Sequence, residues 1–158
     1  AQVVREAGSD AINTIDEPGR SALLLAAMEG HEEACRLLLD REDFALSNAR
    51  NSIGSTALHM AAGNGHCAIC RLLLVSSRFA PIGGVNAQND NGQTPLDFAL
   101  EFGDGLAAEI LASSGGQTSD RSQRRGRKGV GPDLHHRRAH AEAERNASGG
   151  EGRMFSLD

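Results

Sequence analysis

The sequence contains no Trp, no Tyr, only three Cys and no long hydrophobic run. Its longest apolar stretch, from Ala22 to Met28, is far shorter than the roughly 20 residues that a membrane-spanning helix needs. Three cysteines cannot all pair in intramolecular disulfides, and a small secreted scaffold would carry a higher density of them. These absences argue against a membrane span within this sequence and against a disulfide framework.

Charge is distributed unevenly over the 158 residues. Residues 1–112 contain 7 Arg and 15 Asp or Glu, a net charge of −8, whereas residues 113–158 contain 9 Lys or Arg and 6 acids, a net charge of +3. The whole chain carries −5, which argues against a protein devoted to binding nucleic acid. The sequence begins at Ala1, and Val3-Val4 is typical of the end of an apolar helix, so we expect a fragment of a longer chain.

An internal repeat organises the acidic part of the chain. The pattern Asn-x-x-Asp/Asn-x-x-Gly occurs three times with offsets of 35 and 38 residues, beginning at Asn13, Asn48 and Asn86. A second Gly follows the Gly of each pattern by 11 residues, at Gly30, Gly65 and Gly103. An apolar triplet comes after each second Gly, so the register is kept through every unit.

Each unit predicts two short helices joined by a Gly turn. A hydroxyl residue stands two positions after each loop Gly, where it can cap a helix N-terminus: Ser21, Thr56 and Thr94. We expect first helices at 22–29, 57–64 and 95–102, each closed by a Gly in the left-handed conformation. Helices this short need a partner, and we expect it from second helices at 32–39, 67–75 and 106–112.

Two stretches carry a family signature. Thr56-Ala-Leu-His-Met-Ala-Ala with Gly65-His66, and Thr94-Pro-Leu with Ala99 and Gly103, resemble the ankyrin repeat. The resemblance implies an all-α solenoid of helix-turn-helix units with protruding hairpin-like loops. It covers a partial repeat at 1–15 and repeats at 16–50, 51–88 and 89–112. It also implies a non-catalytic module that binds another protein, in the cytoplasm or the nucleus.

Repeats one and three depart from the family signature. The motif histidine is present as His59 in repeat two, but Leu24 and Asp97 take its place in the other repeats. Asp104 also replaces the histidine that follows the turn Gly. These departures predict weaker hydrogen bonding between repeats and leave the predicted fold unchanged.

Residues 113–158 form a Gly/Ser/Arg-rich tail with 8 Gly, 6 Ser and few large apolar side chains. Such a segment cannot bury enough apolar surface to offset its ordering entropy, so we expect it to be disordered. Five cations lie between Arg121 and Lys128, which leaves a nuclear-import or weak nucleic-acid contact as an alternative to a solvated linker. A second alternative is that the repeats are the targeting arm of an enzyme or membrane protein encoded upstream.

Three local patterns resemble sites of chemistry, and each has a structural interpretation that we prefer. His66-Cys67-x-x-Cys70 has no second metal-ligating pair, and the HExxH-like string from His31 ends in Cys35. The dinucleotide-like pattern G-x-G-x-x-A from Gly103 follows a predicted helix instead of a strand. We therefore predict no catalytic, cofactor-binding or metal-binding residues.

The predicted partner-binding residues are positions that need not pack, around each loop Gly and at the ends of the first helices. They are Glu17, Arg20, Met28, Glu29, Ser52, Ser55, Asn64, Asp90, Asn91, Gln93, Glu101 and Phe102. By the resemblance they face one concave side. Their mixture is acidic and polar with two large apolar residues, so we expect a partner that presents basic residues and an apolar contact.

Overall fold

The computed structural model describes residues 8–80 and 83–119, so residues 120–158 of the predicted tail at 113–158 lie outside this range. In the described range, six helices pair into three hairpins: α3 (Ala22–Glu29) with α4 (Glu32–Asp40), α5 (Ala57–Gly63) with α6 (Cys67–Val75), and α7 (Pro95–Glu101) with α8 (Gly105–Ser113). We call these hairpins repeats one, two and three. A short helix α2 (Ser9–Ile12) precedes them, and a 3-10 turn η1 (Gly84–Asn86) precedes α7. The bounds of the six helices agree with the prediction to within one residue at each end.

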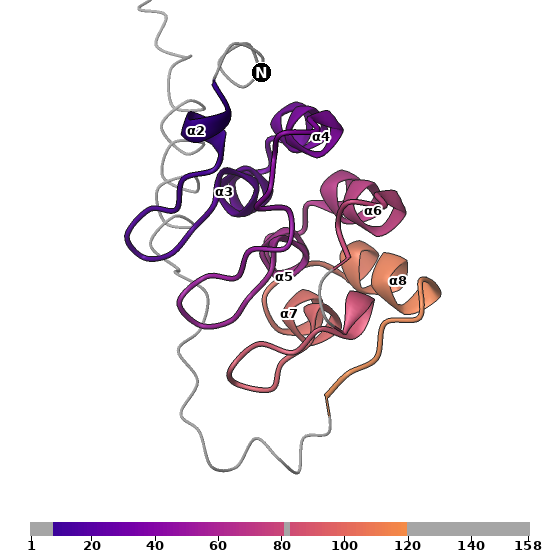
Figure 1. Cartoon of the computed structure of the whole chain (residues 1–158). Helices are drawn as coiled ribbons and strands as arrows, with labels where there is room; N and C mark the ends of the chain where they lie inside the picture. The colour runs from indigo at the N-terminus through magenta and orange to yellow at the C-terminus, as the bar shows by residue number, and fades with distance from the viewer. Residues whose placement is uncertain (1–7, 81–82, 120–158) are drawn as a thin grey trace, which may run out of the picture. The chain divides into compact units, whose positions relative to one another are not determined.

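The hairpins stack in two rows. The first helices α3, α5 and α7 contact one another in one row, and the second helices α4, α6 and α8 contact one another in the other (Figure 1). Every residue of α5 is buried because α3 and α7 pack against its two sides. None of the helices that the structure describes has the length and apolar character needed to cross a bilayer.

Short helices of this kind are held by their caps and neighbours. The Ser21 hydroxyl accepts a hydrogen bond from the Leu24 N–H at 3.4 Å, and the Thr94 hydroxyl accepts one from the Asp97 N–H at 3.2 Å. Both bonds satisfy a backbone donor that the first turn of a helix leaves free. The predicted caps at these two positions are therefore confirmed.

The predicted left-handed turn is confirmed at Gly30 and Gly65, with φ of 81° and 72°, and is wrong at Gly103. The N–H of Gly103 instead bonds to the carbonyl oxygens of Phe98 and Ala99, which closes α7 without a positive φ. Gly is required there for a different reason. A Cβ atom at residue 103 would collide with the carbonyl oxygen of Ala62 in the preceding repeat.

The three Asn-x-x-Asp/Asn-x-x-Gly motifs build three loops of the same form. The side-chain oxygen of the middle motif residue accepts a hydrogen bond of 2.7–2.9 Å from the backbone N–H four residues later: Asp16 from Arg20, Asn51 from Ser55, and Asn89 from Gln93. The motif Gly takes φ of 90°, 73° or 71°, at Gly19, Gly54 and Gly92. Such a φ strongly favours Gly, so the motif fixes the backbone of each loop.

The first motif residue, Asn, makes a second periodic contact that we call the asparagine clamp. Its Nδ2 donates to a carbonyl oxygen about one repeat further along the chain, and its Oδ1 accepts from a backbone N–H two residues beyond that carbonyl. The pairs are Asn13 with Asp43 and Ala45, Asn48 with Arg78 and Ala80, and Asn86 with Gly115 and Gln117. Residues 115–117 thus take the place after repeat three that residues 43–45 take after repeat one.

The predicted disorder of residues 113–158 is wrong for their first part, because α8 extends to Ser113 and further hydrogen bonds hold residues 114–119 against repeat three. The Thr94 hydroxyl donates to the Gln117 carbonyl oxygen at 2.7 Å, and the Ser119 N–H donates to the Asp97 carboxylate at 3.0 Å. Burial opposes ionisation of Asp97, but hydrogen bonds from Thr94 and Ser119 outweigh it and hold the pKa of this carboxyl below its usual value. The carboxylate of Asp97 thus accepts bonds within repeat three and from the segment that follows it. The described residues contain no further repeat beyond α8, so weaker bonding between repeats at this position stays a prediction.

Truncation tests this anchoring. We expect a chain ending at residue 112 to be less stable by about 1–2 kcal/mol than one ending at residue 122, because the buried Thr94 hydroxyl and Asp97 carboxylate lose partners. Each kcal/mol corresponds to a fall of roughly 4–8 °C in melting temperature for a domain of this size. The chain ending at 122 should melt within a few degrees of the full chain by circular dichroism. Equal melting of all three chains would show that the anchoring contributes nothing.

Candidate functional site

The tips of the three loops present exposed side chains at the same position of successive repeats. Glu17, Ser52 and Asp90 each directly follow the middle motif residue, and all three are exposed. The backbone below each tip is closed by a hydrogen bond of 3.0 Å, from the N–H of the middle motif residue to the carbonyl oxygen four residues later. The loops precede α3, α5 and α7 and lie on the same side of the stack (Figure 1). They therefore form a preformed row of variable side chains.

Neighbouring loops are also joined to each other. The N–H of Asp90 donates to the carbonyl oxygen of Ile53 at 3.0 Å, and Asn89 donates to the Ser55 hydroxyl at 3.3 Å. Ser55 is completely buried by these contacts, so it does not fit the predicted set of partner-binding residues. Its sequence position after a loop Gly looked exposed, but the next repeat covers it.

The buried side chain of His59 in repeat two forms a hydrogen bond with the loop of repeat three. Its Nε2–H donates to the Gln93 carbonyl oxygen at 3.0 Å, and its Nδ1 accepts from the Thr56 N–H at 3.2 Å. The ring also meets Phe98 edge-on, with centroids 5.2 Å apart. Burial of the imidazole lowers the pKa of His59 to about 4, so the ring is neutral at neutral pH.

The predicted residues at the ends of the first helices are only partly available. Met28, Glu29, Asn64 and Phe102 are half-buried, and Phe102 packs edge-on against Phe98 with ring centroids 5.6 Å apart. Glu101 is exposed and accepts a hydrogen bond of 2.9 Å from the Gln93 side chain. Phe102 is therefore largely a packing residue, whereas Glu101 remains a surface acid.

Charge on the loop side is dominated by carboxylates. Arg20 is drawn into a salt bridge of 2.8 Å with Asp16, and its hydrogen bond holds the pKa of the Asp16 carboxyl below the usual value. Glu17, Asp90 and Glu101 are exposed acids on the same elements. Of the remaining predicted positions, Asn91 is half-buried at the tip of its loop. The exposed Arg50 also lies on this side, where it donates to the carbonyl oxygens of Gly54 and Gln88, so the acids named here still outnumber the cations.

The histidine and cysteines singled out in repeat two have structural contacts. His66 donates through Nε2 to the Met28 carbonyl oxygen at 3.0 Å and covers Gly30. Burial raises the pKa of Cys70 to about 12, and burial together with Asp104 raises the pKa of Cys67. These shifts run against the thiolate that a helix N-terminus would favour. In the described part of the chain, no three His, Cys, Asp or Glu side chains gather as metal ligands.

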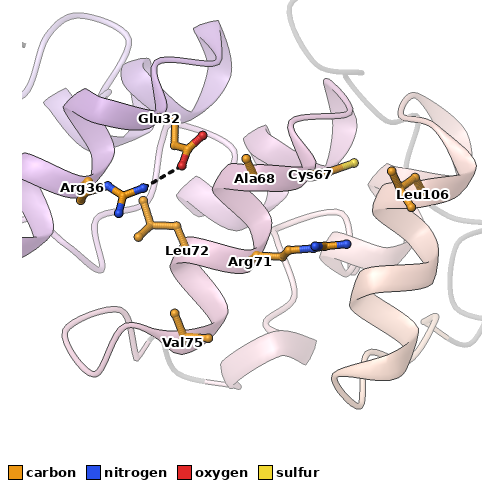
Figure 2. Close-up of a pocket in the computed structure, with 8 residues that line it drawn as sticks. All are labelled: Glu32, Arg36, Cys67, Ala68, Arg71, Leu72, Val75 and Leu106. Carbon is orange, nitrogen blue, oxygen red and sulfur yellow. Dashed lines mark hydrogen bonds and ion pairs between the residues drawn. The ribbon is translucent and has the colours of Figure 1, made fainter.

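A groove that the sequence analysis missed runs over the outer helices. It has a volume of about 480 Å³ and is lined by residues of α4, α6 and α8 (Figure 2): Glu32, Arg36, Cys67, Ala68, Arg71, Leu72, Val75 and Leu106. Val75 and Leu106 are 82% and 51% exposed. An alignment of the three second helices would have singled out these two residues, because other repeats have polar residues at the same positions.

The comparison with known proteins follows the same repeats. The family model described as ankyrin repeats (3 copies) matches residues 2–82 and residues 46–122. No curated protein matches the chain at a significant level. The two matches together span residues 2–122 of 158, and all three hairpins lie within them. The chain therefore belongs to the ankyrin-repeat family.

Proposed function

We propose that the array binds another protein through its loop tips and the adjoining concave side of the first helices, without catalysing a reaction. Ankyrin repeats generally serve as protein–protein interaction modules. The observation that carries the finer proposal is the row of loop tips, in which Glu17, Ser52 and Asp90 are exposed on hydrogen-bonded loops. A surface that is ordered before binding loses little conformational entropy when the partner docks.

The expected partner presents a basic surface. Glu17, Asp90 and Glu101 are exposed, whereas Arg20 is engaged by Asp16. Met28 is half-buried at the end of α3 and supplies a small apolar contact. Because charge complementarity mainly raises the association rate, binding should weaken as salt screens the acids.

Charge reversal on the loop side tests the proposal. We expect Glu17→Lys combined with Glu101→Lys to weaken binding of captured partners about tenfold, since the two changes replace attraction with repulsion. The matched control is Glu42→Lys combined with Glu109→Lys, which makes the same change in net charge at exposed positions away from the loop tips. Partners are captured from cell extract by cross-linking, identified by mass spectrometry and then measured as purified proteins.

The outcome separates the loop side from the rest of the chain. Partners that lose affinity with the first pair and keep it with the control support the proposed surface. Partners that respond equally to both pairs, or to neither, would place the interaction elsewhere. Circular dichroism of each variant confirms that the helices are intact.

A further inference from the structure

We propose that the groove over α4, α6 and α8 is a second docking site, which takes a short acidic and apolar segment of another protein. The groove lies on the second helices, whereas the loop tips precede the first helices, so this site is separate from the loop surface (Figures 1 and 2). Its volume of about 480 Å³ is enough for a few side chains. The groove is open along the helices, which suits a segment of chain better than an enclosed small molecule.

The repeats themselves show that the exposed apolar residues are not needed for folding. Val75 is the last residue of α6, a position that Asp40 occupies in α4 and Ser113 in α8. Leu106 is the second residue of α8, where α4 has Glu33. The fold accepts polar residues at both positions. Exposed Val and Leu there create an apolar surface that packing within the array does not explain.

The charge at the groove follows from a second difference between repeats. Arg36 forms a salt bridge of 2.8 Å with Glu32 and lies 3.8 Å from Glu33. Arg71 takes the same position in α6, but Cys67 and Ala68 replace the two glutamates. Among the described residues Arg71 therefore has no ion-pair partner, and its side chain extends toward α8 beside the groove (Figure 2).

No carboxylate of the described residues lies within ion-pair distance of Arg71. Cys67 stays a neutral thiol, because its burial and the nearby Asp104 raise its pKa. Asp104 lies at the Cys67 end, 3.7 Å from the thiol sulfur, where its carboxylate caps α8 through the Ala107 N–H at 2.8 Å. The body of the chain is acidic, with 15 acids against 7 Arg in residues 1–112. A ligand with a carboxylate beside a bulky apolar side chain therefore complements the Arg71 charge and the apolar lining of this groove. The acids on the remaining surface would repel the same carboxylate.

The occupant is accordingly a segment with a Leu, Met or Phe next to Asp or Glu. Leu72 and Val75 lie on one side of Arg71 and Leu106 lies on the other (Figure 2). An apolar side chain of the segment would lie against one of these two sides, and its carboxylate would accept hydrogen bonds from the Arg71 guanidinium between them. A guanidinium binds a carboxylate through two parallel N–H donors, which adds orientation to the contact.

The probe is a display library of short peptides that fix one Leu or Phe beside two Asp or Glu, selected against the full chain. A second library carries Lys in place of the acids. Selected peptides are synthesised with fluorescein and titrated by fluorescence anisotropy. We expect binders from the acidic library alone, with affinity that falls as salt rises.

Three variants use residues that the chain itself holds at the same position of another repeat: Arg71→Glu as in α8, Val75→Asp as in α4, and Leu106→Glu as in α4. Each should weaken the selected peptides about tenfold or more while leaving the helix content unchanged. The control Arg78→Glu makes the same charge change at an exposed residue outside the groove and should leave binding intact. The pair Glu17→Lys and Glu101→Lys should also leave it intact, which keeps this test independent of the loop surface.

A footprint locates the bound peptide. Cys35 and Cys70 are completely buried, whereas Cys67 is half-buried and lines the groove. Bound peptide should therefore slow the alkylation of Cys67 by iodoacetamide at least fivefold, by simple occupancy at saturation. The proposal is overturned if the acidic library gives no binder, if the three groove variants bind as well as wild type, or if Cys67 is not protected. Sedimentation that shows a second copy of the chain occupying the groove would overturn it as well.

Discussion

Gly103→Ala is expected to lower the free energy of unfolding by about 2–3 kcal/mol, because the added methyl group has no space. A Cβ at residue 103 would collide with the Ala62 carbonyl oxygen and lie 2.9 Å from that of Ala99. Both neighbours are backbone atoms in the first helices, so they cannot move aside as a flexible side chain could. Relief requires repeats two and three to separate slightly, which disturbs the packing of α5 against α7. Urea denaturation followed by circular dichroism measures the change.

Gly105→Ala is the matched control for this substitution. Gly105 is the first residue of α8, and a Cβ there would meet nothing within 4 Å. Alanine favours the helix over glycine, so this variant should be neutral or more stable by up to about 1 kcal/mol. Equal stability of the two variants would show that residue 103 tolerates a side chain and that the contact with Ala62 is unimportant.

His59→Leu is expected to lower the free energy of unfolding by about 2–3 kcal/mol, because it leaves buried polar groups without hydrogen-bond partners. The substitution removes the acceptor for the Thr56 N–H and the donor for the Gln93 carbonyl oxygen. Leu24 occupies the same position in repeat one, so leucine itself fits the local helix. The cost should therefore come from the lost link to the next loop. His66→Leu is the comparison variant. Because His66 is only half-buried, this substitution should lower the free energy of unfolding by less.

The same histidine should give stability a characteristic pH dependence. Burial lowers the pKa of His59 to about 4 in the folded chain, against about 6.5 when unfolded. Below about pH 6.5 the unfolded chain binds a proton that the folded chain excludes, so stability is complete above that pH and falls as pH drops toward 4. The loss amounts to about 3 kcal/mol for a shift of this size. Wild type should show this slope and His59→Leu should lack it; parallel curves would contradict the assignment.

The sequence predicted the fold well because local chemistry determines it. A loop Gly with positive φ, a hydroxyl cap and a Gly turn constrain the backbone within a few residues, and all six helices lie where these signals place them. Contacts between repeats, in contrast, join residues that lie far apart in the sequence, and local signals do not predict them. The Asn residues of the loop motif were visible in the sequence, but their clamping contacts lie about 30 residues away.

The predicted binding surface was less accurate for the same reason. Ser55 stands where a single repeat would expose it, but Asn89 of the next repeat covers it. Phe102 differs, because Phe98 packs against it from one turn earlier in α7, a local contact that the helix period already allows. Gly103 was interpreted by its position after a helix, although its role is set by the Ala62 carbonyl oxygen of another repeat. The outer groove was missed because Arg71, Val75 and Leu106 belong to different helices and come together only when the repeats stack.

The hydrogen bonds between repeats are distributed unequally, and this affects how the array opens. Repeats two and three are joined by the bonds from His59 to Gln93, from Asp90 to Ile53 and from Asn89 to Ser55. Repeats one and two keep the bond from His66 to the Met28 carbonyl oxygen, but Leu24, at the position of His59, offers no polar atom to repeat two. In a linear array each interface can open separately, so we expect repeats one and two to separate before repeats two and three do. Backbone amides of α5 and α7 should consequently be the last to exchange with solvent, because the interface between these two helices should stay closed longest.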